Sequence, residues 1–178
     1  MRYFLEYFIV IMLSVNSFGQ QSFNYSVQLE PVIISDLPGL HSYAAAQHDG
    51  KWLIIGGRKD GMHARTPMSS FPSSQNNTEI YVIDVNSQQF WSASLNKLPT
   101  GIFEQLQSTN MNFYQDNDTL YIIGGYGFSS TANDHVTYPN LTTVQVSDVI
   151  HAVINGTTIV PYIKQITDTI FAVTGGQL

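Results

Sequence analysis

The sequence contains no cysteine. Disulfides, zinc–thiolate sites, iron–sulfur clusters and a cysteine nucleophile are therefore excluded. Charge is also scarce, because Asp, Glu, Lys and Arg make up 11% of the 178 residues, against roughly 25% in an average soluble domain. The 13 acidic residues outnumber the 7 Lys and Arg, and the net charge is −6. This balance argues against nucleic acid, or an anionic membrane surface, as the main partner.

The first 19 residues have the pattern of an export signal. Arg2 precedes an apolar stretch at Phe8–Val15, and Ser17 and Gly19 place small residues before Gln20. A buried first strand or helix and a membrane anchor are the alternatives, but a spanning helix needs ~20 apolar residues. We predict that residues 1–19 are a cleaved signal peptide. A secreted or cell-surface location follows, and an exported chain without cysteines fits a bacterial protein.

Three apolar, β-rich runs each end in a glycine pair. The pairs are Gly56–Gly57, Gly124–Gly125 and Gly175–Gly176. Each run follows a turn containing Asp, at Asp49–Gly50, at 116–118 and at Thr167–Asp168, and a further candidate strand precedes each turn. Asp-Gly between two strand-like runs is a strong hairpin signal. The pattern predicts three repeated β-hairpins.

The first repeat extends to four strands. Residues 79–85 and 89–95 read as a third and a fourth strand, which gives a four-stranded unit. The second repeat has no clear fourth strand. Residues 147–156 combine an N-cap Ser, a short apolar run and a glycine stop, so a short helix is favoured there over a strand.

Together these features resemble the kelch-repeat family, in the form of exported bacterial kelch proteins. The glycine pairs recur at roughly the 50-residue period of kelch repeats. Leu37–Pro38 and Leu98–Pro99 match the lead into a blade, and Asp84 with Phe90 matches the spacing from the third strand to the following aromatic residue. The resemblance implies an all-β, kelch-type β-propeller in which the glycine pairs pack closely at the ends of the second strands.

The expected propeller is an incomplete arc of about two and a half blades, whereas propellers have roughly 4 to 8. Residues 20–36 are expected to hold a strand, at Tyr25–Leu29, that closes the last blade. Residues 37–97 would be blade one, 98–158 blade two with a helical insertion, and 159–178 the first half of blade three. The remaining blades are expected from a longer chain, with a truncated gene product or completion by another chain as alternatives.

Loops of a propeller carry function because the blades hold them around one face. The candidate ligand-binding residues on that face are Arg58, Lys59, His63, Arg65, Glu104, Tyr126 and His135. A basic cluster in an acidic chain favours contact with an anion or a carboxylate, which Arg grips with two hydrogen bonds. A solvated loop is the alternative reading. No catalytic motif, metal-ligand pair or cofactor motif accompanies these residues.

The predicted function is a non-catalytic binding or display scaffold for a protein or a glycan, with no nucleic acid, no cofactor and no transmembrane segment in the mature chain. The alternative is a carbohydrate-active enzyme on the same scaffold. Among kelch relatives, a sialic-acid mutarotase-like isomerase or a galactose-oxidase-like oxidase would represent that class. The isomerase would use Arg58 and Glu104 at the channel, and the oxidase would need a cysteine, which this chain lacks.

Overall fold

The computed structural model describes residues 25–61 and 71–176. The chain divides into two units, residues 1–31 and 32–178. In the first unit, described residues 25–31 have no regular secondary structure, and Tyr25, Val27 and Leu29 are exposed. The strand predicted at Tyr25–Leu29 is therefore absent. Its alternating pattern is correct for a strand, but none of the described strands pairs with it, and a strand needs ladder hydrogen bonds to persist.

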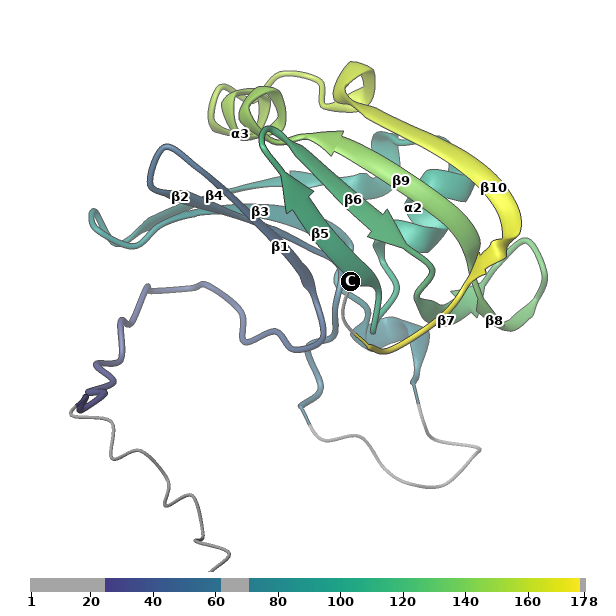
Figure 1. The fold of residues 1–178 in the computed structure, drawn as a ribbon, viewed down its shortest axis with the longest axis horizontal. Helices are drawn as coiled ribbons and strands as arrows, with labels where there is room; N and C mark the ends of the chain where they lie inside the picture. The colour runs from purple at the N-terminus through teal and green to yellow at the C-terminus, as the bar shows by residue number, and fades with distance from the viewer. Residues whose placement is uncertain (1–24, 62–70, 177–178) are drawn as a thin grey trace, which may run out of the picture. The chain divides into compact units, whose positions relative to one another are not determined.

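The second unit contains two sheets, each with four strands. The first sheet is an antiparallel meander of β1 (Ala44–His48), β2 (Lys51–Ile55), β3 (Glu79–Asp84) and β4 (Gln89–Ser94). Asp49 and Gly50 join β1 to β2 with φ angles of 48° and 71°. Positive φ at both central residues is what a type I′ hairpin turn requires. The four strands predicted for the first repeat are confirmed (Figure 1).

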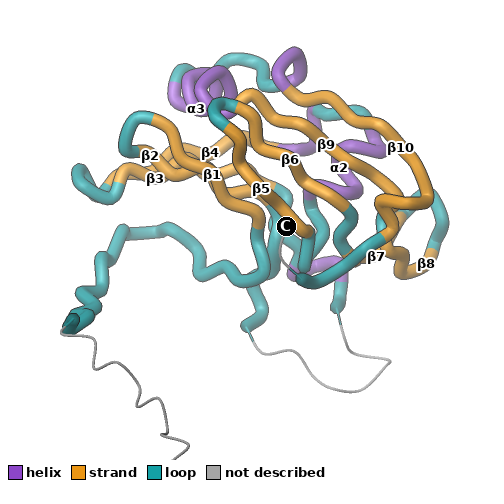
Figure 2. Tube along the Cα trace, viewed as in Figure 1, coloured by secondary structure: helices purple, strands orange, loops and turns teal. Residues whose placement is uncertain are grey.

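The second sheet has the order β10-β9-β6-β5. Its strands are β5 (Asn112–Asp116), β6 (Thr119–Ile123), β9 (Pro139–Gln145) and β10 (Ile163–Ala172). A separate hairpin of β7 (Tyr126–Ser129) and β8 (Asp134–Thr137) is inserted between β6 and β9. The all-β expectation is correct at this level, since antiparallel sheets dominate the chain (Figure 2).

The hairpin predicted at Thr167–Asp168 is wrong. Residues 163–172 form one strand, β10, which pairs with β9 and has a register shift between Thr167 and Ala172. These residues therefore supply the fourth strand of the second sheet, which the sequence did not reveal, and not the first hairpin of a third unit. Pairing with β9 satisfies more backbone groups than a local turn would.

The described residues form two α-helices beside the sheets. The helix favoured at 147–156 is present as α3 (Val146–Ile154), and α3 packs against the first sheet. A second helix, α2 (Thr100–Leu106), was not predicted, because Pro99 and Gly101 mask its short pattern. Single turns of 3-10 helix lie at Ser73–Gln75, Leu95–Lys97 and Val160–Tyr162.

The two sheets and α3 share one hydrophobic core, and strands β1 and β5 lie next to each other. Gln115 of β5 fastens them, because its side chain donates to the carbonyl of Gln47 (2.8 Å) and accepts from the backbone N–H of Gln47 (2.7 Å). The polar side chain thus continues the backbone ladder from one sheet to the next.

The two sheets face this core with opposite faces of equivalent strands. On β2 the core residues are Leu53 and Ile55, and on β6 they are Leu120 and Ile122. Ile55 directly precedes its glycine pair, whereas Ile122 stands two positions before its own. Successive side chains of a strand point to opposite faces. When the two repeats are aligned on their glycine pairs, the core face of the first sheet therefore corresponds to the face of the second sheet that points away from the core.

We call the faces that point away from the core the outer faces. The outer face of the first sheet carries Tyr43, Trp52, Ile54, Tyr81, Ile83 and Phe90. The outer face of the second sheet carries Tyr114, Tyr121, Ile123, Leu141 and Ile166. The first of these faces is mostly apolar, and the second alternates its apolar residues with polar ones, namely Asn112, Asp116, Thr119, Thr143 and Lys164.

The first two glycine pairs stand where backbones approach closely. A Cβ atom on Gly57, whose φ is 85°, would lie 2.5 Å from the carbonyl oxygen of His41. A Cβ atom on Gly124 would overlap the carbonyl group of Val173. Gly175 also has a positive φ, but it has open space around it.

Candidate binding site at the loop edge

One edge of the two sheets gathers most of the long connections. β1 and β5 begin there, and β2 and β6 end there. Residues 37–43 before β1, residues 56–61 and 71–78 after β2, the α2 region before β5 and the β7–β8 hairpin after β6 therefore meet at this edge, which we call the loop edge (Figure 1). Backbone hydrogen bonds between Thr109 and Tyr126 (3.0 and 2.8 Å) join two of these connections.

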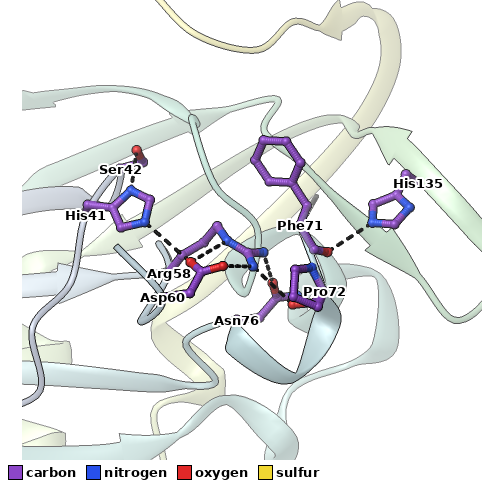
Figure 3. Close-up of polar contacts among 8 residues, drawn as sticks. All are labelled: His41, Ser42, Arg58, Asp60, Phe71, Pro72, Asn76 and His135. Carbon is purple, nitrogen blue, oxygen red and sulfur yellow. Dashed lines mark hydrogen bonds and ion pairs between the residues drawn. The ribbon is translucent and has the colours of Figure 1, made fainter. Parts of the chain in front are cut away.

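Arg58 lies inside the loop edge, and its residue is 1% exposed. Its guanidinium donates from Nε to Asp60 Oδ1 (3.0 Å) and from Nη2 to Asp60 Oδ2 (2.7 Å). Nη1 donates to Asn76 Oδ1 (3.0 Å), and Nη2 also donates to the carbonyl of Pro72 (3.1 Å) (Figure 3). The bidentate carboxylate contact expected for a ligand is therefore made to Asp60 within the chain, and Arg58 is not on an open surface.

His41 extends this network on the side of Asp60. His41 Nε2 lies 3.5 Å from Asp60 Oδ1, and His41 Nδ1 lies 3.1 Å from Ser42 Oγ (Figure 3). The hydrogen bonds from Arg58 are the largest cause of a lowered pKa at the Asp60 carboxyl, and they outweigh its partial burial, which raises the pKa. Asp60 is thus held as a carboxylate between two cationic or polar partners.

Four rings form an aromatic cluster beside this network, namely Phe71, Tyr126, Phe128 and His135. The His135 ring stacks on Tyr126, with centroids 5.7 Å apart and an interplanar angle of 21°. Phe71 meets Tyr126 edge-on at 5.3 Å, and Phe128 meets His135 edge-on at 5.6 Å. Edge-to-face and offset pairs at these separations are favourable. His135 Nε2 also donates to the carbonyl of Phe71 (3.1 Å) (Figure 3).

Arg58 and the aromatic cluster are in contact. The guanidinium carbon of Arg58 lies 5.3 Å from the centroid of the Phe71 ring, within the range of a cation–π interaction. The cluster therefore has a charged, hydrogen-bonded base on one side. The exposed turn of the β7–β8 hairpin, at residues 130–134, joins the strands that carry Phe128 and His135.

Glu104 fixes that hairpin from α2. Its buried carboxylate accepts from Ser129 Oγ (2.7 Å), Ser130 Oγ (2.6 Å), and both the N–H (2.9 Å) and Oγ1 (3.0 Å) of Thr131. Burial by itself raises the pKa of Glu104, but these hydrogen bonds outweigh it, and the net pKa is lowered. Glu104 therefore acts as an internal acceptor that holds the turn, not as a surface contact.

The structure places the sequence-predicted site residues in three groups. Arg58 and Glu104 are buried and hydrogen-bonded within the chain, Tyr126 and His135 stack in the aromatic cluster, and Lys59 is exposed. His63 and Arg65 lie outside the described residues. Sequence reasoning missed Asp60 and Phe71. The one available signal was the position of Asp60 two residues after Arg58 in a chain with few charges.

Two features are absent from the described residues, namely a metal-binding group and a membrane-spanning helix. In residues 25–61 and 71–176, no three His, Asp or Glu side chains come together as a metal-binding group. No helix in this part of the chain is long and apolar enough to cross a membrane. Arg58 and Glu104, which an isomerase would need facing a substrate, are both engaged in internal hydrogen bonds.

Comparison with described protein families and with curated proteins finds no significant match to this chain.

Proposed function

We propose that this chain is a non-catalytic binding module, exported to the cell surface or secreted, that takes a glycan or protein ligand at the loop edge. We propose further that its two sheets are neighbouring blades of a kelch-type β-propeller. The observation that carries the binding proposal is the aromatic cluster. It stands at the loop edge, where most of the long connections meet, and it is anchored by two buried charged residues, Arg58 and Glu104.

The relation between the sheets supports the propeller. Each sheet has four antiparallel strands, and β1 and β5 lie side by side. At equivalent positions the side chains of β2 point into the shared core and those of β6 point away from it, which is what a rotation from blade to blade produces. The close packing at Gly57 and Gly124 also falls at the ends of the second strands, as the kelch resemblance implies.

The cluster has the properties of a preorganised recognition site. Its rings are half-buried, so their orientation is fixed while part of each ring meets solvent. The exposed turn between Phe128 and His135 carries the polar residues Ser130, Asn133 and Asp134. Ser130 Oγ donates to Glu104, and Asp134 Oδ1 accepts from the N–H of His135. Apolar ring faces beside a few fixed polar groups are typical of small-ligand sites. This combination favours a glycan, whose sugar rings present both C–H faces and hydroxyl groups.

An immobilised panel of oligosaccharides, followed by calorimetry with the best soluble binder, tests the proposal. Tyr126→Ala removes the central ring, and we expect a loss of affinity of at least tenfold, because aromatic anchors dominate binding energies. Tyr25→Ala is the matched control, since Tyr25 is an exposed tyrosine outside the two sheets. Equal losses in both variants, or no binder in the panel, would count against a glycan site at the cluster.

A further inference from the structure

We infer that the outer face of the second sheet binds the outer face of the first sheet of another copy of this chain, head to tail. The contact would continue the interface that already exists inside the chain. There, the core face of the first sheet and the core face of the second sheet are buried together. In the alignment of the repeats, the outer face of the second sheet corresponds to the core face of the first sheet. The outer face of the first sheet corresponds to the core face of the second sheet.

The outer face of the second sheet lacks a partner within the described residues. Tyr114 is 56% exposed and Ile166 is 60% exposed. Tyr121 and Ile123 are half-buried, although they occupy the positions that Leu53 and Ile55 fill in the first repeat, where both side chains are completely buried. In the first repeat, the side chains at these positions are buried against the core face of β6. A surface of that same kind is therefore the partner expected for Tyr121 and Ile123.

The outer face of the first sheet presents that same type of surface. Ile54 stands two positions before its glycine pair, as Ile122 does in the second repeat, where it faces the first sheet. Trp52 is 41% exposed and Tyr43 is 38% exposed on this face. An apolar cleft of about 150 Å³ lies between this face and residues 37–40, with room for an incoming side chain.

The Leu-Pro segments repeat this relation. Leu98 is buried in the core shared by the two sheets. Leu37, its counterpart in the first repeat, lines the cleft on the outer face of the first sheet. Both interfaces would therefore contain a leucine from the segment that leads into the sheet.

Head-to-tail contacts join unlike faces. An open series of copies therefore has one free face of each type at its two ends, and no free face is left once the series closes into a ring. Counting only the two four-stranded sheets of the described residues, two to four copies would bring together roughly 4 to 8 such sheets, the number of blades in a closed propeller. A symmetric pairing of like faces would not reproduce the contact found inside the chain.

Two variants, each blocked on one face, test the inference. Tyr43→Glu with Trp52→Glu blocks the first sheet, and Tyr114→Glu with Ile166→Glu blocks the second. All four side chains are exposed, so the substitutions spare the core. Mass is measured by light scattering after size exclusion, at tens of micromolar chain, and circular dichroism checks that both variants keep the β-sheet signal.

We expect the wild-type chain to run at the mass of two to four copies, or to grow into larger open assemblies. Each variant alone should be monomeric. An equimolar mixture should double in mass, because one intact face of each type remains. A monomeric wild type would leave both faces to blades of a longer chain and would overturn the inference, as would a blocked variant that still self-associates or a mixture that stays monomeric.

Discussion

Arg58 and Asp60 form a two-pronged ion pair inside the loop edge, with N–O distances of 3.0 and 2.7 Å. The arginine is 1% exposed, and it also holds Asn76 and the carbonyl of Pro72. A basic residue that the sequence placed on a ligand-binding surface is therefore a structural anchor for the connection that follows β2.

Replacing Arg58 should destabilise the fold. Arg58→Ala leaves the Asp60 carboxylate and the Asn76 amide without their partner, and loss of one member of a buried pair costs roughly 3–5 kcal/mol. Because Asp60 is partly exposed, we expect about 2–4 kcal/mol in the free energy of unfolding measured with urea. Lys59→Ala, at the exposed neighbouring position, should change it by less than about 0.5 kcal/mol. Equal stability of the two variants would contradict the anchor role of Arg58.

Removing the Glu104 carboxylate should loosen the β7–β8 hairpin. Glu104→Ala deletes the acceptor of four hydrogen bonds, and an unmet buried group costs about 1–3 kcal/mol. Hydrogen exchange at Thr131 should accelerate, since its N–H donates to Glu104. Glu104→Gln should be intermediate, because one oxygen remains. Glu30→Ala, outside the two sheets, is the control, and unchanged exchange at Thr131 in Glu104→Ala would refute the role assigned to Glu104.

Stability should fall in acid through Asp60 and Glu104. Hydrogen bonds lower the pKa of Asp60 from its ordinary value of 3.8, and that of Glu104 from 4.5. A depressed pKa means that the folded state favours the carboxylate, so this stabilisation is present above the ordinary pKa and is lost as the pH falls through the folded pKa. Between about pH 5 and pH 2, Glu104→Gln should lose less stability than the wild type. Parallel pH profiles would show that Glu104 does not contribute.

Gly124 and Gly175 have nearly the same φ, 67° and 68°, but different surroundings. Alanine at Gly175 should cost only the backbone strain of positive φ, about 1 kcal/mol. Alanine at Gly124 adds an overlap with the Val173 carbonyl, and we expect at least twice that loss in thermal or urea unfolding. If both variants lose the same stability, the end of β10 does not pass next to Gly124.

Several elements follow directly from the local sequence. The Asp49–Gly50 turn places β1 and β2 in register, and α3 begins and ends near its sequence signals. At Thr167–Asp168 the local sequence predicts a turn that the fold does not contain. Asp168 Oδ1 still accepts from the N–H of Ile170 (3.0 Å), as a local turn would predict, yet the chain continues as β10.

Turn geometry and side-chain alternation are local properties, so the residues of each segment predicted the first two glycine-paired hairpins, the antiparallel strands and the short helix α3. The burial of Arg58 and Glu104, the pairing of β10 with β9 and the stacking of Tyr126 on His135 arise from contacts made in the folded chain. Glu104 bonds to residues 25 to 27 positions away and Arg58 to Asn76, 18 positions away, whereas Tyr126 and His135 share one hairpin. Desolvation and packing between segments leave no periodic trace in the residues that meet.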